Sequence, residues 1–330
     1  MKAILNKLFR HQSLNKQEAK EVLSNLASGQ YNNSHMAAFL TVYLMRSITV
    51  DELEGFRDAM LELCVRVPLD DFNTIDLCGT GGDGKDTFNI STLSSFVTAG
   101  AGQHVTKHGN YGVSSKCGSS NLLESFGCRF GNDMDIIKKS IDESGICFLH
   151  APMFHPAMKN VGPVRKELGI KTFFNMLGPM VNPAFPKNQL VGVFSLELAR
   201  LYGYLYQKGT ANFMIVHALD GYDEVSLTGD FKVISNEAER VMAPAGLGLP
   251  RLKMEELSGG DTIEDSAIIF TNVLENKATE AQKSAVLANA GLAISVGKQI
   301  TIEEGIGQAL ESIESGKALQ SFKKFIEINS

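Results

Sequence analysis

The chain has 330 residues, of which 44% are hydrophobic, and its formal net charge at pH 7 is −6. This length is enough for two domains, or for one large domain with a smaller one attached. The acidic balance argues against a nucleic-acid-binding surface, and no apolar run reaches the roughly 20 residues that a membrane-spanning helix needs.

The cysteines and the N-terminus indicate a reducing compartment. The five cysteines are scattered and lack CxxC spacing, so neither a zinc site nor a disulfide framework is indicated. Residues 1–10 have the pattern of an amphipathic helix rather than of a signal peptide. We therefore expect a cytoplasmic protein.

Residues 1–67 have helical patterns throughout. Asn15 with Glu18, and Thr49 with Glu52, have the spacing of a capping box, which marks a helix N-terminus. Ser34 is expected to begin a third helix that runs to about residue 45. This segment predicts a small all-helical domain.

A set of apolar residues in the third helix recurs at helical spacing. The set predicts packing within the helical bundle, and a helical dimer interface is the alternative. Its members are Met36, Phe39, Leu40, Tyr43 and Leu44.

From residue 74 onward, short apolar strands alternate with helices, after a linker at 68–73. This alternation predicts an α/β domain over 74–330, with a mainly parallel central sheet flanked by helices. The strand ends are then expected to face a ligand crevice. The expected strands are 74–78, 105–107, 146–150, 190–194 and 213–217, and the expected helices include 134–143, 196–207, 279–296 and 302–314.

A glycine-rich cluster at 79–84 lies between the first expected strand and a helix that begins near Ile90. Glycines let the backbone turn tightly and approach a ligand, and a helix N-terminus offers free N–H groups to an anion. Asn89 is expected to cap this helix, and Ser91 and Thr92 add hydroxyls. The pattern is neither a P-loop nor a dinucleotide fingerprint, and an ordinary glycine-rich turn is the alternative.

Two further polar clusters follow, at 107–110 and 114–120. A cation, an imidazole, a glycine and an amide in a row (Lys107 to Asn110) favour the rim of a polar ligand site over a core segment. Ser119 precedes a Leu-Leu-Glu helix and is expected to be its N-cap, which would create a second anion site.

Taken together, the motifs of the chain resemble the anthranilate phosphoribosyltransferase family over essentially its whole length. The motifs, in chain order, are GTGGD (79–83), NIST (89–92), KHGN (107–110), GS (118–119), RKELG (165–169), FNMLGP (174–179), NP (182–183) and DE (223–224). The resemblance implies transfer of phosphoribosyl from phosphoribosyl diphosphate to anthranilate, the second step of tryptophan biosynthesis from chorismate. It also implies a homodimer formed by the helical domains, Mg²⁺ as cofactor, and a segment near 164–186 that returns to the helical domain. It leaves open an anthranilate synthase subunit as partner.

The resemblance also implies a role for each motif residue. Lys107 and His108 are the candidate catalytic residues, although catalysis should rest mainly on positioning and electrostatics. Expected at phosphoribosyl diphosphate are Gly79, Gly82, Asp83, Thr87, Asn89, Ile90, Ser91, Thr92, Lys107, Ser115 and Ser119. Expected at anthranilate are Gly79, His108, Asn110, His155, Arg165, Met176, Gly178 and Pro179. The expected magnesium ligands are Ser91, Asp223 and Glu224, since magnesium prefers oxygen ligands.

Some of these residues have simpler readings, and the chain departs from the family pattern at a few positions. Ser119 could be a plain helix cap, residues 220–224 a solvated acidic turn, and each histidine a structural residue. Tyr111 and Lys171 stand where arginine is usual, and Ser120-Asn121 where Ala-Asp is frequent. A pyrimidine-nucleoside phosphorylase is the second hypothesis, although its Lys-His-Ser motif differs from residues 107–110. A non-catalytic, nucleic-acid-binding relative of the same fold is the third.

Overall fold

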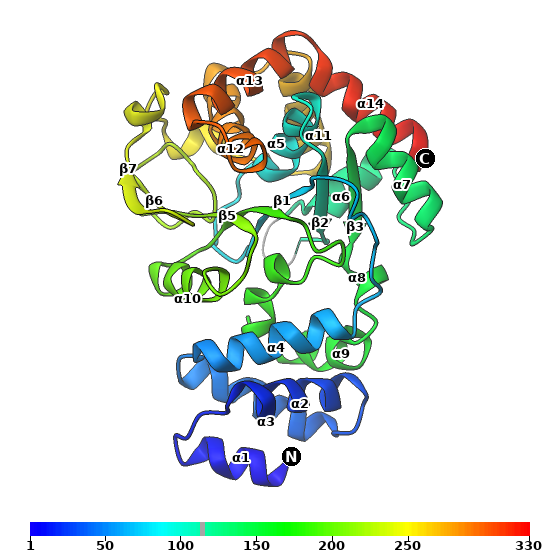
Figure 1. Ribbon diagram of the computed structural model, residues 1–330, viewed down its shortest axis with the longest axis vertical. Helices are drawn as coiled ribbons and strands as arrows, with labels where there is room; N and C mark the ends of the chain where they lie inside the picture. The colour runs from blue at the N-terminus through cyan, green and yellow to red at the C-terminus, as the bar shows by residue number, and fades with distance from the viewer. Residues whose placement is uncertain (113–115) are drawn as a thin grey trace.

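The computed structural model describes residues 1–112 and 116–330, and it has a helical end and an end built on a sheet (Figure 1). The helical end contains the first four helices. These are α1 (Lys2–Phe9), α2 (Lys16–Ala27), α3 (Asn33–Met45) and α4 (Val50–Glu62).

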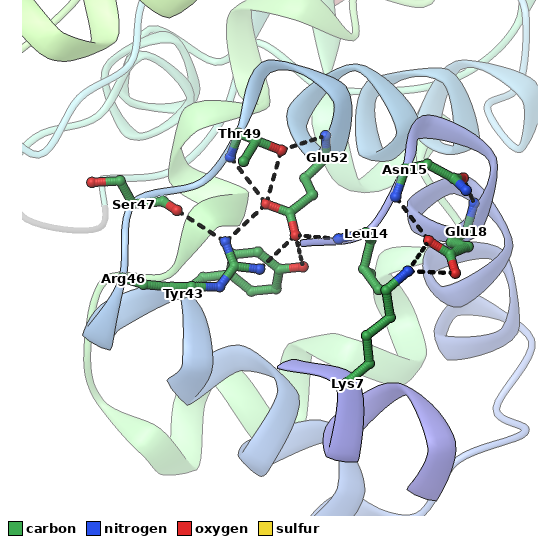
Figure 2. A network of polar contacts seen from close by, with 9 residues as sticks. All are labelled: Lys7, Leu14, Asn15, Glu18, Tyr43, Arg46, Ser47, Thr49 and Glu52. Atoms are coloured by element: carbon green, nitrogen blue, oxygen red, sulfur yellow. Dashed lines mark hydrogen bonds and ion pairs between the residues drawn. The ribbon is translucent and has the colours of Figure 1, made fainter. Parts of the chain in front are cut away.

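The capping residues determine where these helices begin. The capping boxes of Asn15 with Glu18 and of Thr49 with Glu52 are confirmed, and Figure 2 shows both. The expected start of α3 was wrong. Its N-cap is Asn32 rather than Ser34, and Asn32 Oδ1 accepts a hydrogen bond from the His35 N–H at 2.9 Å. An asparagine is as good a cap as a serine, and here it comes first along the chain.

The apolar residues of α3 pack inside the protomer. Met36, Phe39, Leu40 and Tyr43 are all buried, and Phe39 and Tyr43 meet the ring of Phe173 edge-on. Packing within the bundle is therefore confirmed for these four, and they are not available to a dimer interface. Leu44 alone of the set is exposed.

Phe173 belongs to a later segment that lies against the first four helices. This segment contains α9 (Met158–Leu168) and the short 3₁₀ helices η1 (Phe173–Met176) and η2 (Gly178–Met180). Val161, Val164 and Phe173 share one apolar core with α1–α4. The segment thus joins the helical end to the sheet, while the domain limits at 67, 74 and 164–186 stay predictions.

The sheet has seven strands in the order β3-β2-β1-β4-β5-β6-β7. The first five strands pair in parallel, and β6 and β7 are added antiparallel. The predicted α/β fold, with a mainly parallel sheet flanked by helices, is confirmed. The strands are β1 (Ile75–Gly79), β2 (Val105–Gly109), β3 (Ile146–His150), β4 (Asn188–Gly192), β5 (Asn212–Ala218), β6 (Phe231–Ser235) and β7 (Glu239–Met242).

Two strand expectations need correction. β4 lies two residues before the predicted 190–194, because its pairing with β1 runs from Ile75–Asn188 to Gly79–Gly192. The sequence did not predict β6 and β7. β7 is a mostly exposed edge strand, so it lacks the apolar run that revealed the inner strands.

Helices cover both faces of the sheet (Figure 1). α5, α12 and α14 share one core with β1 and β2, and α10 shares a second core with the helical end. No single helix among the described residues is long and apolar enough to cross a membrane; α12 and α13 reach that composition only together, across a bend of 116°. The helices of this end are α5 (Ile90–Gly100), α6 (Ser119–Ser125), α7 (Met134–Ser144), α8 (Ala151–Phe154), α10 (Leu196–Tyr206), α11 (Ile263–Leu274), α12 (Glu280–Lys298), α13 (Ile302–Glu314) and α14 (Lys317–Asn329), with η3 (Pro244–Leu247) and η4 (Met254–Leu257).

Candidate active site

A cleft of about 330 Å³ lies at the carboxyl ends of β1 and β2. It brings together the glycine-rich cluster, the N-terminus of α5, the end of β2, α9 and the loop after β5. Predicted residues that line it are Gly79, Gly82, Asp83, Thr87, Asn89, Ile90, Ser91, Thr92, Lys107, His108, Asn110, Ser119, Arg165, Gly178, Asp223 and Glu224.

Four predicted residues are not placed on that lining. His155 and Pro179 are buried, and neither is among the described residues that line the cleft; the same holds for Met176, which faces a groove beside α3. Ser115 lies outside the described residues. The expected roles of these four residues stay predictions.

The glycine-rich cluster takes the backbone conformation for which glycine is suited. Gly81, Gly82 and Gly84 have φ values of 65°, 78° and 74°, in the left-handed region. Asn89 occupies the capping position of α5, but its side chain makes no capping bond and instead donates to the Cys117 carbonyl at 3.0 Å. The capping expectation for Asn89 was therefore wrong. The Ile90 N–H donates to the Phe88 carbonyl, and the Asn89 side chain leaves the N–H groups of Ser91 and Thr92 available to an anion.

The two carboxylates of the DE motif follow β5 and are supported by glycines of neighbouring strands. A Cβ at Gly192 would lie 1.4 Å from the Asp223 carbonyl oxygen, and one at Gly79 would lie 2.3 Å from Asp223 Oδ2. Only glycine at these strand ends lets the loop approach so closely. The Gly81 N–H donates to Asp223 Oδ2 at 2.6 Å, and the Thr87 hydroxyl donates to Glu224 Oε1 at 2.8 Å.

The negative charges of Asp223 and Glu224 are only partly compensated by the surrounding protein. Burial, and then the nearby Asp83, raise the pKa of Asp223 to about 7. Burial and the neighbouring Asp223 raise the pKa of Glu224 well above its ordinary value, while Thr87 and Lys107 act in the opposite direction. Such a pair is stabilised in its ionised form by a bound cation.

The donor set fits magnesium rather than a metal held entirely by protein. Within the described part of the chain, no group of three or more His, Cys, Asp or Glu side chains forms a metal site. Magnesium is usually held by one or two carboxylates, water and substrate phosphates. Asp223, Glu224 and the Ser91 hydroxyl, which share the wall of the cleft, match that pattern.

Lys107 is a buried residue of the cleft wall and donates a hydrogen bond to Ser91. Its Nζ donates to the Leu77 carbonyl at 2.6 Å and to Ser91 Oγ at 3.4 Å, and burial lowers its pKa.

Asp76, which no predicted motif includes, is fully buried nearby and accepts a hydrogen bond from the His108 N–H at 3.2 Å. Burial raises the pKa of Asp76 to about 6. An acidic residue inside a predicted buried strand was the signal that could have revealed it.

Arg165 faces the cleft from α9 without an acidic partner among the described residues. Its Nη2 donates to Asn175 Oδ1 at 3.3 Å, and its guanidinium lies 5.1 Å from the centre of the Phe174 ring. Its buried Nε–H has no partner, and burial lowers its pKa. A guanidinium with an unused N–H beside a cleft is suited to bind a planar carboxylate.

His108 joins β2 to the segment that carries Gly178. Its Nδ1 lies 3.1 Å from the Gly178 carbonyl oxygen. Burial and the adjacent His155 lower the pKa of His108 to about 3, and burial lowers that of His155 to about 4. Both rings are therefore neutral at pH 7, and His108 is a weak general base at that pH.

The residues that depart from the family pattern make contacts around the cleft. The Tyr111 hydroxyl donates to Glu124 Oε1 at 2.7 Å, and Lys171 Nζ donates to the Gly82 carbonyl. Asn121 Oδ1 accepts from the N–H groups of Gly112 and Gly118 at 3.0 and 3.1 Å. These hydrogen bonds connect the segment after β2 to α6, and Lys171 to the glycine-rich cluster.

The expectation that Ser119 is an N-cap was wrong, because the backbone enters α6 one residue earlier. Gly118 is the cap, and Ser119 is the first residue of the helix. The Ser119 hydroxyl donates to the Asn110 carbonyl at 3.2 Å and so holds the KHGN segment to α6. The second anion site expected at this seven-residue helix stays a prediction.

Comparison with known proteins places these features in one family. Residues 71–319 match the a/b domain of a glycosyl transferase family, and residues 2–64 match its helical bundle domain. The anthranilate phosphoribosyltransferases of Christiangramia forsetii and Flavobacterium johnsoniae are 60% and 61% identical over 329 residues, which cover 100% of this chain and 99% and 100% of theirs.

Solved structures agree along the whole chain. The anthranilate phosphoribosyltransferase of Thermus thermophilus is 32% identical with a TM-score of 0.92, and each chain is covered to 98%. That of Saccharomyces cerevisiae in complex with PRPP and Mg is 28% identical with a TM-score of 0.90, covering 98% of this chain and 96% of the other. A further structure of the yeast enzyme contains 4-fluoroanthranilate. The chain therefore belongs to the anthranilate phosphoribosyltransferase family.

Proposed function

We propose that the protein transfers the 5-phosphoribosyl group of phosphoribosyl diphosphate to the amine of anthranilate and releases diphosphate, the second step of tryptophan biosynthesis. The observation that carries this proposal is the charge arrangement of one cleft. Arg165, a cation without an acidic partner among the described residues, faces the same space as two poorly compensated carboxylates, Asp223 and Glu224.

The glycine-rich cluster and the N-terminus of α5 bind the diphosphate end. Free N–H groups of the loop and helix face the phosphate oxygens, and Ser91 is oriented by Lys107. Mg²⁺ held by Asp223, Glu224 and Ser91 would offset the negative charge that grows on the departing diphosphate. The Gly81 and Thr87 hydrogen bonds keep the two carboxylates facing the cleft.

Arg165 and Asn110 bind the anthranilate end. The guanidinium donates two parallel hydrogen bonds to the anthranilate carboxylate, and this orients the amine toward C1 of the ribose. The aromatic amine is neutral at pH 7, so its lone pair needs no strong base to release it, in keeping with the low pKa of His108. Catalysis then consists of positioning and of electrostatic stabilisation of the leaving diphosphate.

An assay with anthranilate, phosphoribosyl diphosphate and Mg²⁺ tests this function, with the loss of anthranilate fluorescence as the readout. Magnesium-dependent loss of fluorescence is expected. A pyrimidine-nucleoside phosphorylase would instead release base from a pyrimidine nucleoside when inorganic phosphate is added. No change in either assay would contradict the enzymatic proposal.

A homodimer and a cytoplasmic location accompany the proposed function. Leu44 and Met45, at the end of α3, are exposed apolar residues of the helical end. Replacing both with aspartate should give monomers in sedimentation analysis if the dimer forms there. An unchanged dimer would place the interface elsewhere.

A further inference from the structure

We propose that Asn289 of α12 is a positioning residue that fixes the Asp223–Glu224 pair for metal and diphosphate. The residue touches neither carboxylate through a hydrogen bond. It acts on the next peptide along the chain, that of Val225. The inference rests on the proposed function, because it concerns the magnesium end of that cleft.

The Asn289 amide binds both polar groups of Val225. The Val225 N–H donates to Asn289 Oδ1 at 3.1 Å, and Asn289 Nδ2 donates to the Val225 carbonyl at 2.9 Å. The second hydrogen of Nδ2 goes to the Ala285 carbonyl of the same helix, also at 2.9 Å. Both donors of the amide are therefore used, and two of its three bonds hold one loop residue, Val225, through the peptide groups on either side of it.

The Asn289 side chain carries a buried amide, whose polar groups need hydrogen-bond partners. Asn289 is only 4% exposed, and its neighbours Ala288 and Ala290 are fully buried apolar residues. An unpaired amide there would be strongly destabilising. The paired bonds of Asn289 therefore hold the loop at Val225 against α12.

The position of Val225 is transmitted directly to the metal ligands. Val225 follows Glu224, and the other side of the loop is held because the Ala218 N–H donates to the Tyr222 carbonyl at 3.1 Å. Asn289, Asp223 and Glu224 also line one small cavity of about 20 Å³ together with Ser91. The ligand pair thus lies between two fixed peptides, and Asn289 supplies one of the two.

Metal binding measured without turnover tests this role. Mn²⁺ replaces Mg²⁺, inorganic diphosphate is present, and electron paramagnetic resonance reports free Mn²⁺. Outer-shell partners of metal ligands typically change affinity by 10- to 100-fold, so Asn289→Ala is expected to weaken Mn²⁺ binding about tenfold. The KM for phosphoribosyl diphosphate should rise with it, while the KM for anthranilate stays unchanged.

Ala293→Gly is the matched control, because it lowers helix stability at a fully buried position of α12 without touching the Val225 pairing. It should lower the melting temperature and leave Mn²⁺ affinity at the parent value. If Asn289→Ala lowers the melting temperature but binds Mn²⁺ as this control does, Asn289 is merely structural and the inference is wrong.

A second variant covers the case in which Asn289→Ala does not fold. Asn289→Ser replaces the carboxamide with a hydroxyl, and serines already occupy buried positions of this helix at 284 and 295. Serine is too short to span both Val225 groups, so weaker Mn²⁺ binding is again expected, and parent-like binding would overturn the proposal. If the parent protein does not consume anthranilate at all, the proposed function fails instead.

Discussion

Two regions of the molecule bury carboxylates in opposite ways. Glu52 at the helical end is fully buried and accepts hydrogen bonds from Arg46, Tyr43, Thr49 and the Leu14 N–H (Figure 2). Burial alone would raise the pKa of Glu52, but the bonds from Arg46, Thr49 and Leu14 outweigh it, so the pKa lies below its ordinary value.

The carboxylates of the cleft lack such partners. Asp223 accepts one hydrogen bond from the Gly81 N–H and Glu224 accepts one from the Thr87 hydroxyl. Burial, and then the neighbouring carboxylates, raise the pKa of both groups. The same contrast holds for cations: Arg46 is bound by Glu52, whereas Arg165 has no acidic partner among the described residues. The ion pair of Glu52 with Arg46 belongs to the fold, whereas charged groups without a counter-ion are suited to bind ligands.

Removing the unpaired charge should have the largest effect on activity. Asp223→Asn combined with Glu224→Gln is expected to lower turnover by on the order of a hundredfold or more, since charge stabilisation of the leaving group is lost. Without metal, the melting temperature should not fall, because two repelling carboxylates are neutralised. Turnover against Mg²⁺ concentration and thermal melting measure both effects.

The control for that double variant is Glu311→Gln with Glu314→Gln, which removes the same charge from α13, outside the cleft. Parent-like turnover is expected there. If the Asp223 and Glu224 variant also kept the parent curve against Mg²⁺, these two residues would not belong to the metal site.

Breaking the fully paired group should affect stability and not chemistry. Glu52→Gln leaves Arg46 without its buried counter-ion, which typically costs about 3 kcal/mol of unfolding free energy. Urea denaturation measures this loss, and turnover well below the melting temperature should stay near the parent value. Glu18→Gln is the matched control: its pair with Lys7 is partly exposed, so a loss below about 1 kcal/mol is expected.

Arg165→Ala tests whether the unpaired cation is a substrate group. A hydrogen bond to a charged group contributes about 1.5–3 kcal/mol, so the KM for anthranilate should rise by roughly tenfold to a hundredfold. The KM for phosphoribosyl diphosphate should change far less. Arg165→Lys keeps the charge but cannot donate two parallel hydrogen bonds, so its KM for anthranilate should lie between those of the parent and of Arg165→Ala. Equal increases in both KM values would contradict a carboxylate contact.

The sequence predicted what depends on local patterns. The capping boxes at Asn15 and Thr49 follow from spacing within a few residues and were placed correctly. The inner strands were also found from local patterns, although β4 begins two residues before its predicted start. The glycine-rich cluster and the polar strand ends have local signatures, whereas the roles of Arg165, Asp223 and Glu224 came from the family resemblance. Most of the predicted site residues do line one cleft.

The remaining features depend on contacts that spacing does not encode. The local sequence around Asn89 predicts a capping side chain. In the structure this side chain instead donates to the carbonyl of Cys117, 28 residues away. Asn289 bonds a residue 64 positions away, and Gly192 is required because another loop crosses it. Nothing near these residues in the sequence marks the partner. The low pKa of His108 likewise follows from burial by several segments.

The smallest expected effect is the pH dependence of metal binding, which follows from the opposite pKa shifts in the two regions. A raised pKa of about 7 means that folded Asp223 holds a proton which the unfolded chain has already lost. Its stabilising contribution is complete below the unfolded pKa near 4 and is lost as pH rises through 7. Metal must displace this proton, so from pH 8 to pH 6 Mn²⁺ affinity should weaken about tenfold, or about 1.4 kcal/mol.

Lys107, Asp83 and Glu224 share this environment, and diphosphate itself titrates. The comparison is therefore made with Asp223→Asn, which should lose the Asp223 part of the pH dependence, and with Glu52→Gln, which should keep it. Identical pH profiles for all three proteins would show that Asp223 carries no such proton.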